Sequence, residues 1–454
     1  MRFTKTILIL LITTGGIFAQ SKSKKGVMPP APDLRMIVDK MANEIDAQVV
    51  ENRHWLHQNA ELSNREFKTS EYIAKYLRSI GIEPQTGIAK TGVVGLIKGG
   101  KPGPTILLRA DIDGLPVTER VDLPWKSTNR DVFNGMNVGV MHACGHDTHT
   151  SMLMGAAKIL YSMKDQLKGN VKLVFQPAEE GAPIGEEGGA ELMMKEGVME
   201  NPTVDVAFGL HINSLTPVGH INYKPEGIMA AVNGFSIKIK GKQVHGSTPW
   251  DGIDPVVVGA QIVMGLQTIV SRQTELTKEA AVVTVAMFHG GVRNNIIPEE
   301  VELGGTIRTL DKEMQAKIHE KIKLTATKIA ESMGATATLT IHPGYPLTYN
   351  DPALTEQMLP TLKKVVGDKN VHLIKAVTGA EDFSFFGLKV PSLFLFLGGM
   401  PAGTERSKAP SHHTPDFYVD DTAMKHGVKT LCNLVLDYAD SWKGVPVMSS
   451  APSK

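Results

Sequence analysis

This chain of 454 residues has few cysteines and almost no net charge. With two cysteines, it cannot be a small disulfide-rich scaffold. The formal net charge is +1, and no block of lysine and arginine interleaved with aromatic residues occurs. Because a nucleic-acid-binding protein usually carries such a basic footprint, we expect no nucleic-acid partner.

Long hydrophobic runs are also lacking. The apolar run 7–12 is too short to span a bilayer, and no later segment approaches the roughly 20 apolar residues that a membrane span needs. The run follows Arg2 and Lys5 and precedes small residues that end at Ala19, which is the pattern of a secretory signal. We expect residues 1–19 to be a signal peptide, and the mature protein to be exported, periplasmic or secreted, without a membrane span.

An α/β pattern begins after a short leader. Residues 20–33 are rich in Ser, Lys and Pro and predict a flexible leader, and helical periodicity starts near Leu34. Helical stretches such as 151–163 then alternate with short β runs, which favours a mostly parallel sheet. These β runs span residues 93–97, 105–110, 171–175 and 204–210.

The pattern changes near residue 230. The period-2 strand 234–240 opens a series of elements whose β-α-β-β-α-β order is typical of a ferredoxin-like α+β domain. The later elements are a helix over 254–270, strands over 281–287 and 301–308, a helix over 312–333 and a strand over 336–341. We expect residues 230–341 to form an inserted lid or dimerisation domain.

The α/β pattern returns in the last quarter of the chain. A helix over 352–366 and a strand of buried type over 392–397 predict that the first sheet is completed here. The expected catalytic domain therefore has two parts, residues 34–229 and 342–443. Residues 444–454 are expected to form a disordered tail.

The densest chemical signal lies between residues 140 and 149, where five side chains could bind a metal. They are His142, Cys144, His146, Asp147 and His149. Cys144 and His146 lie two apart around a glycine, so both can reach one ion from a turn or a strand end. A disulfide with Cys432 is the alternative for Cys144, but the neighbouring ligands favour a thiolate that binds metal.

Three further segments place acids or histidines after predicted strands, at 108–113, 175–181 and 208–211, and a fourth lies in the loop 411–415. They add one of Glu179 or Glu180, then His211, then one of His412 or His413 to Cys144 and His146. Five ligands are too many for one tetrahedral zinc with an open position, so they predict two ions that share a bridge.

The two adjacent glutamates can have different roles. In a loop, one of Glu179 and Glu180 can bind the metal while the other acts as general base on a metal-bound water. The alternative is a helix N-terminus, where acidic residues interact favourably with the helix dipole.

Taken together, these segments resemble the aminoacylase and carboxypeptidase family of dinuclear metallopeptidases, peptidase family M20, in its amidohydrolase branch. The matching segments run in order from about residue 36 to 440, and that branch includes hippurate hydrolases, N-acyl-amino-acid amidohydrolases and auxin-conjugate hydrolases. The segments are 109–116, 142–147, 176–181, 209–211, 245–249, 295–298, 379–383 and 413–415.

The resemblance implies a complete metal site with a base and a supporting acid. Cys144 would bridge two divalent ions, Glu179 would be the general base, and Asp111 would be the supporting aspartate. The implied ligands are Cys144, His146, Glu180, His211 and His413. Distant members have His-x-Asp where this chain has Arg109-Ala110-Asp111, so His146 would replace the missing histidine. These ligand types favour zinc or manganese, with cobalt or nickel as alternatives.

The resemblance also implies residues that bind substrate. His245 would stabilise the oxyanion, reaching the site from the partner subunit of a homodimer. Asn295, Arg308 and the backbone near Gly379 would hold the free carboxylate of the substrate. The alternatives are a solvent-facing loop histidine for His245 and a surface salt bridge for Arg308.

The expected function is that of an exported metal-dependent amidohydrolase that cleaves small N-acyl amino acids or short peptides. A metallo-carboxypeptidase or dipeptidase with the same centre is the first alternative, and a non-catalytic ligand-binding protein is the second. The loop 181–189 and Trp250 depart from many relatives and are expected to line the acyl pocket.

Overall fold

The computed structural model describes residues 1, 2, 4, 6, 8 and 33–444. Most of the predicted leader over 20–33, most of the predicted tail over 444–454 and most of the predicted signal peptide lie outside these residues. The chain divides into the units Met1–Asp33 and Leu34–Lys454, and the second contains the helices and strands discussed below.

The elements of the first catalytic segment alternate between strand and helix after three initial helices. The helices are α1 (Leu34–Glu44), α2 (Asp46–Gln58), α3 (Phe67–Ser79), α4 (His146–Ser162) and α5 (Gly189–Lys195). The strands are β1 (Gln85–Ile88), β2 (Gly92–Lys98), β3 (Lys101–Asp111), β4 (Arg130–Phe133), β5 (Met136–Gly139), β6 (Lys168–Gln176), β7 (Val206–Pro217), β8 (Ile221–Tyr223) and β9 (Glu226–Met229).

The inserted segment and the C-terminal segment follow. The inserted segment has β10 (Ala231–Lys240), β11 (Val244–His245), α6 (Pro255–Gln273), β12 (Ala281–Gly290), β13 (Ile296–Ile297), β14 (Glu300–Thr309), α7 (Lys312–Ser332) and β15 (Thr336–Pro343). The C-terminal segment has β16 (Thr348–Asn350), α8 (Pro352–Val366), β17 (Val371–Leu373), the 3-10 helix η4 (Asp382–Leu388), β18 (Ser392–Met400) and α9 (Met424–Ser441).

The catalytic domain is built on an eight-stranded sheet of order β1-β2-β6-β3-β7-β18-β8-β17. Its central strands β6, β3, β7 and β18 are parallel, whereas β1 and β2 join antiparallel at one edge. Adjacent residues of β3 point into different cores, Leu108 toward α4 and α9 and Leu107 toward α5 and η4. The sheet is therefore buried on both faces, which explains the continuous apolar runs and confirms the predicted mostly parallel α/β class.

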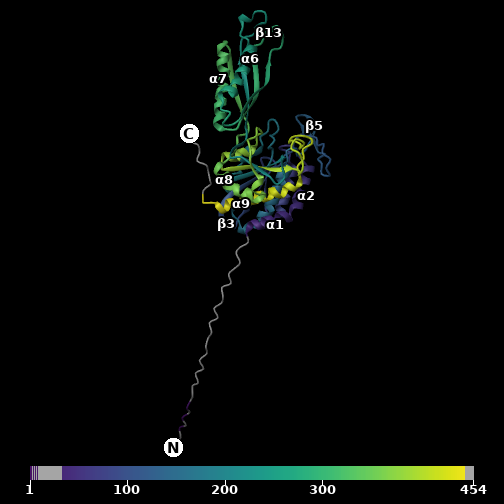
Figure 1. Cartoon of the computed structure of the whole chain (residues 1–454), viewed down its shortest axis with the longest axis vertical. Coiled ribbons are helices and arrows are strands. Elements are labelled where there is room, and N and C mark those ends of the chain that lie inside the picture. The colour runs from purple at the N-terminus through teal and green to yellow at the C-terminus, as the bar shows by residue number, and fades with distance from the viewer. Residues whose placement is uncertain (3, 5, 7, 9–32, 445–454) are drawn as a thin grey trace. The chain divides into compact units, whose positions relative to one another are not determined.

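Helices α1, α2, α4 and α9 pack together over the first of these cores (Figure 1). Helix α4 is buried along most of its length, because neighbouring helices cover the side that faces away from the sheet. Its first turn carries His146, so a rigid element positions that side chain.

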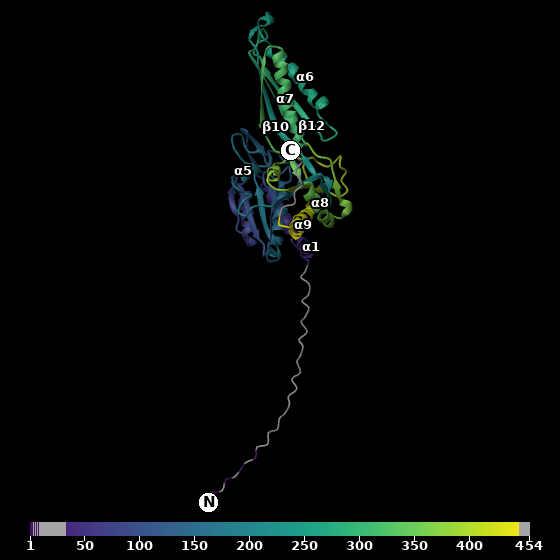
Figure 2. The ribbon, with the colours of Figure 1, turned by 90° about the vertical axis from the view of Figure 1, so that its left-hand side faces the viewer.

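The inserted segment forms its own two-layer structure. Strands β12, β14, β10 and β15 make an antiparallel sheet, and α6 and α7 pack side by side on it (Figure 2). Alternate residues of β10 are buried, as the period-2 pattern predicts. Asp254 and Asp311 accept hydrogen bonds from the first-turn N–H groups of α6 and α7 and fix where these helices begin. This arrangement matches the expected α+β class.

Helix α6 is also apolar enough, by length and composition, to cross a membrane. Its buried residues, Val258, Ile262, Leu266 and Ile269 among them, pack in the core of the inserted domain. This packing accounts for the buried part of its apolar surface, whereas Val256, Val257 and Met264 of the same helix are exposed.

Two features of the fold differ from the sequence prediction. The strand expected over 204–210 begins at Val206 and continues to Pro217, because its polar second half remains paired with β18, so His211 lies within the strand and not after it. Short strands such as β8, β16 and β17 were not predicted, since three residues are too few to establish a period.

Candidate metal centre

Cys144 and His146 flank Gly145, a position that no other residue could occupy without strain. Gly145 has φ +95°, and a Cβ there would lie 2.4 Å from Ile212 Cγ2. The residue immediately precedes α4, so the chain turns sharply between the cysteine and the histidine. This turn lets two ligand types only two residues apart face one site.

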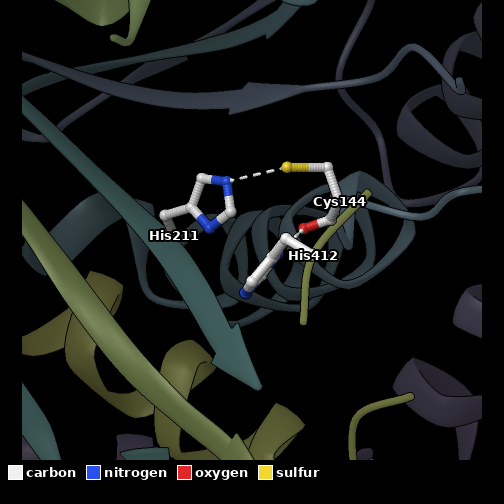
Figure 3. A group of neighbouring side chains, drawn as sticks. All are labelled: Cys144, His211 and His412. Atoms are coloured by element: carbon white, nitrogen blue, oxygen red, sulfur yellow. Dashed lines mark hydrogen bonds between the residues drawn. The ribbon is translucent and has the colours of Figure 1, made fainter. Parts of the chain in front are cut away.

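The sulfur of Cys144 lies between two imidazoles from distant parts of the chain. Its Sγ is 3.3 Å from Nε2 of His211 on β7 and 3.2 Å from Nε2 of His413 in the C-terminal loop. Figure 3 shows the first of these contacts, with the His211 ring directed at the sulfur. Cys144 thus occupies the central position that a bridging ligand requires.

Glu180 and His146 complete the set of expected metal ligands. Glu180 Oε1 lies 3.1 Å from His413 Nε2 and 3.9 Å from His146 Nε2. The other glutamate, Glu179, places Oε2 3.8 Å from the same nitrogen of His146. The structure therefore brings together all five expected ligands and the expected base, from β7, α4 and three loops.

The histidines of this group present one nitrogen each to the centre. His146 donates from Nδ1 to the carbonyl of Asp113 at 2.8 Å, and His211 donates from Nδ1 to the carbonyl of Ile212 at 2.6 Å. Since a carbonyl can only accept, Nδ1 of each ring carries a hydrogen, and Nε2 is the nitrogen that faces the centre and can bind a metal in its deprotonated form.

The donor set fits two divalent metal ions. Nε2 of His146 is buried without a hydrogen-bond partner, which is costly unless a cation satisfies it. Cys144, Glu180 and His413 have ligand atoms within 4.8 Å of one another, and Cys144 is also this close to His211. Thiolate, imidazole and carboxylate together are a common ligand set for zinc and similar ions.

His149 also lies close to this group, but both of its nitrogens are occupied. Its Nδ1 is 2.6 Å from Asp111 Oδ1, and its Nε2 accepts a hydrogen bond from the backbone N–H of Ile212 at 2.7 Å. The ring therefore links α4 to β3 through Asp111 and to β7 through Ile212, and it has no lone pair left for a metal.

Asp111 is the most heavily engaged carboxylate beside the centre. Its Oδ2 accepts a hydrogen bond from the Arg109 guanidinium at 2.7 Å and lies 3.7 Å from His146 Nε2. Burial alone would raise the pKa of Asp111, but His146, His149 and Arg109 hold it well below its usual range. Asp111 is thus a fixed negative charge next to a ligand histidine.

The metal-free centre retains protons on its ligands. Burial, with Glu180 and Glu179 nearby, raises the pKa of the Cys144 thiol well above its usual value. Burial would lower the pKa of His146, but Asp111, Asp113 and Glu180 raise it to about 10. Burial and neighbouring carboxylates, Glu381 first among them, raise the pKa of Glu179. This excess of negative charge is what bound divalent cations would neutralise.

A cavity of about 300 Å³ opens beside these ligands. Glu179, Gly379, Glu381 and the apolar side chains of Met229 and Phe396 form part of its wall. A larger cavity of about 580 Å³ lies next to β2 and β6, but its lining contains none of the expected ligands. We therefore place the substrate in the smaller cavity.

Three residues expected to bind substrate do not line this cavity. His245 in β11 and Asn295 are exposed, and Arg308 in β14 is half-buried. His245 Nδ1 accepts a hydrogen bond from the backbone N–H of Ser247 at 3.1 Å. Within this chain the inserted domain does not contribute these side chains to the pocket.

The expected acyl-pocket residues also lie elsewhere. Trp250 is 77% exposed, and no residue of 181–189 lines the cavity. The loop is instead held by Glu186, which accepts hydrogen bonds from Arg65 at 2.5 Å and from Asn64 at 3.1 Å. These contacts hold the loop against the segment that precedes α3, so the expectation that it lines the acyl pocket is wrong for this structure.

Two residues that sequence reasoning did not single out belong to the site. Asp113 accepts hydrogen bonds from Ser63 Oγ at 2.7 Å and from the Glu180 backbone N–H at 3.0 Å. The hydroxyl of Tyr345 donates to the carbonyl of Glu179 at 2.6 Å. The Asp-x-Asp spacing could have identified Asp113, whereas nothing local marks Tyr345.

Comparison with known proteins shows the family to which the chain belongs. Residues 107–437 match the model of the peptidase family M20/M25/M40. Thermostable carboxypeptidase 2 of Saccharolobus solfataricus is 37% identical over 409 residues, which cover 89% of this chain and 99% of that protein. N-acetyl-L-cysteine deacetylase of Bacillus subtilis is 35% identical over 382 residues, covering 84% and 85% respectively.

The chain is also similar to a solved structure of the same family. The YxeP protein of Bacillus subtilis, described as a dinuclear metal-binding peptidase from the M20 family, superposes with a TM-score of 0.74 at 32% identity. The match covers 88% of this chain and 99% of that one.

Proposed function

Since this chain belongs to the peptidase family M20/M25/M40 and is a metal-dependent hydrolase of amide bonds, we propose that it cleaves N-acyl amino acids. The products would be a carboxylic acid and a free amino acid. The observation that carries the proposal is the convergence of Cys144, His146, Glu180, His211 and His413 beside Glu179 at one cavity. We assign these five as the ligands of two divalent metal ions, most simply zinc or manganese, with cobalt or nickel as alternatives.

The mechanism follows from the placement of Glu179. Bound metals would supply an acidified water and neutralise charge on the amide oxygen. Glu179 takes a proton from the attacking water and delivers it to the nitrogen of the leaving amine. The hydrogen bond from Tyr345 to the Glu179 carbonyl fixes the backbone of the base. Asp113 holds both the Glu180 backbone and His146, so the ligands keep their orientation during the reaction.

The cavity wall supports an acyl substrate. Met229 and Phe396 offer apolar contact to an acyl group, and Glu381 is engaged by Arg109 at 2.8 Å. Because this carboxylate is already paired, it is a poor partner for the free ammonium of a dipeptide. We assign the carboxylate of the substrate to the backbone near Gly379, which lines the cavity, and to Asn295 and Arg308, which do not line the cavity of their own subunit and, like His245, would be supplied by the partner subunit.

A carboxypeptidase or dipeptidase is the second candidate, favoured by the similarity to thermostable carboxypeptidase 2. A panel that pairs each N-acetyl amino acid with the glycyl dipeptide of the same residue separates the two. We expect higher kcat/KM for the acetyl compounds, loss of activity with chelator, and recovery on adding metal. Higher kcat/KM for the dipeptides throughout the panel would favour the peptidase instead.

The proposal includes a homodimer in which His245 serves the partner's site. It is supported by the absence of His245 from the cavity wall of its own subunit and by exposed apolar residues on α6, namely Val256, Val257 and Met264. Mixing inactive His245→Ala and Glu179→Ala proteins, with subunit exchange, should restore part of the activity, because mixed dimers contain one intact site. No recovery despite exchange would contradict this arrangement.

Export is the last part of the proposal. It rests on the basic, apolar and small-residue pattern of residues 1–19. N-terminal sequencing of the protein purified from its native cells should begin near residue 20. An intact Met1 in mature, active protein would contradict export through this segment.

A further inference from the structure

The chain around His413 is held in an unfavourable backbone conformation. His413 has φ +62°, in the left-handed region that non-glycine residues rarely adopt. Such strain persists only where surrounding contacts enforce it. The His413 side chain is also 54% exposed, so packing does little to direct it.

Hydrogen bonds hold the segment on both sides. The N–H of His413 donates to the carbonyl of Ala143 at 2.8 Å, next to the ligand Cys144. On the other side, Ser214 of β7 donates from Oγ to the carbonyl of Pro410 at 2.7 Å. The loop is thus fixed between the segment that carries Cys144 and the strand that carries His211.

The ring of His412 joins these two sides directly. Its Nδ1 lies 3.1 Å from the carbonyl of Cys144, and its Nε2 lies 3.2 Å from the backbone N–H of Ser214. Figure 3 shows the imidazole below Cys144 and His211, with the first of these bonds marked. A carbonyl only accepts and an N–H only donates, so the partners require a neutral ring with hydrogen on Nδ1.

This bonding leaves His412 without a nitrogen for a metal. Its ligand atoms lie within 4.8 Å of those of Cys144 and His211, so proximity alone would allow it to bind. Binding would require breaking the bond to Ser214 and leaving that buried N–H unpaired, which is unfavourable. The ring also contacts Phe417, with centroids 4.8 Å apart, and this contact restrains its rotation.

We propose that His412 is a positioning residue that clamps the Cys144 backbone to β7 and thereby holds His413 in the metal centre, without binding metal itself. The proposal rests on the proposed function, because the ligands it positions are those assigned above. In this role the neutral imidazole maintains the strained conformation of His413 before any metal binds.

Metal titration of purified, metal-depleted full-length protein tests the clamp. The amide nitrogen of asparagine is an N–H donor two bonds from Cβ, at the same distance along the side chain as Nδ1 of histidine. His412→Asn can therefore restore the hydrogen bond to the Cys144 carbonyl, whereas His412→Ala cannot. We expect His412→Ala to bind two Co²⁺ ions, one of them about 10- to 100-fold more weakly than in the wild type. His412→Asn should recover much of this affinity, with the Co²⁺ absorption spectrum of the wild type.

The matched control is His372→Ala, since His372 is also a partly buried histidine that bonds a neighbour, His220, at 2.8 Å. It should leave both affinities unchanged. Thermal unfolding of each metal-free variant checks folding.

Two results would overturn the clamp. One is a single Co²⁺ site in both His412 variants with an altered spectrum, as expected for a lost ligand, and the other is unchanged affinity in His412→Ala. Failure of the wild type to bind metal at all would instead overturn the proposed function, so the two failures are distinguishable.

Discussion

The sulfur of Cys144 and Nε2 of His413 lie 3.2 Å apart although 269 positions separate the two residues in the chain. Each is brought there by a different device, a glycine turn before α4 for Cys144 and a strained loop for His413. In a centre assembled in this way, the loss of a metal ligand, of the general base or of a distant supporting residue should change metal affinity and activity in different ways.

Replacing Glu179 should separate catalysis from metal binding. Glu179→Ala removes the base and leaves the ligand set intact, so we expect two bound metals and a fall in kcat of about 10²- to 10⁴-fold. Metal analysis and steady-state kinetics on the same preparation check both statements. Normal turnover in this variant would refute the base assignment.

Replacing Cys144 should have the opposite pattern. Cys144→Ser keeps the size of the side chain but removes the thiolate from the middle of the ligand group. We expect weaker binding of both ions, because a bridge serves both, and a Tm that no longer rises on adding zinc. Cys432→Ser is the matched control, since Cys432 is buried in α9 without a ligand histidine in the described contacts. Loss of one ion alone would contradict the bridging role.

Metal binding should release protons and weaken as the pH falls. In the metal-free protein the pKa of the Cys144 thiol is raised, and the pKa of His146 is raised to about 10, so both groups are protonated at neutral pH. A metal binds only the deprotonated forms. Calorimetry in two buffers of different ionisation enthalpy should give more than one proton released per protein. Binding with no proton release would contradict these protonation states.

A stability test away from the ligands concerns His57. Its Nδ1 lies 3.1 Å from Asp147 and its Nε2 lies 3.2 Å from Glu119. Burial would lower the pKa of His57, but Asp147 and Glu119 raise it to about 9. Since the pKa of His57 is higher in the folded protein than in the unfolded chain, its charge stabilises the fold. This stabilisation is complete below the unfolded pKa of about 6.5 and is lost as the pH rises through 9.

His57→Gln should therefore lower the free energy of unfolding by on the order of 3 kcal/mol at pH 6 and by much less at pH 9.5. Denaturant unfolding of the metal-loaded proteins at both pH values measures this. An equal destabilisation at both pH values would show that the charge of His57 is not what stabilises the fold.

The substrate carboxylate can be tested through Arg308. If the guanidinium pairs with it, Arg308→Ala should raise KM about tenfold or more for N-acetyl amino acids, with a smaller effect for their amides. Arg272→Ala, an exposed arginine in the last turn of α6, is the control and should leave KM unchanged. An unchanged KM in Arg308→Ala would exclude this role.

Much of the fold could be predicted because its signals are local. The buried strands β6 and β18 appear as apolar runs, and the alternation in β10 shows directly which residues face the core. Short strands such as β17 depend on their neighbours in the sheet, so nothing in their own residues predicts them.

The ligands could be predicted for a different reason. Metal-binding side chains are few and occur in recognisable clusters, and the choice of Glu180 and His413 came from family resemblance. The supporting contacts were harder to predict. The hydrogen bond from Tyr345 to Glu179 spans 166 positions, and the two bonds of the His412 ring depend on how the loop is seated. Such contacts follow from tertiary packing and leave no local pattern.

The most direct test of the account is stepwise addition of metal to metal-depleted protein, with bound metal and hydrolysis of an N-acetyl amino acid measured at each step. The account predicts that two ions bind per chain and that activity appears only as the site fills. Full activity in the metal-free protein, or saturation at less than one ion per chain, would contradict it.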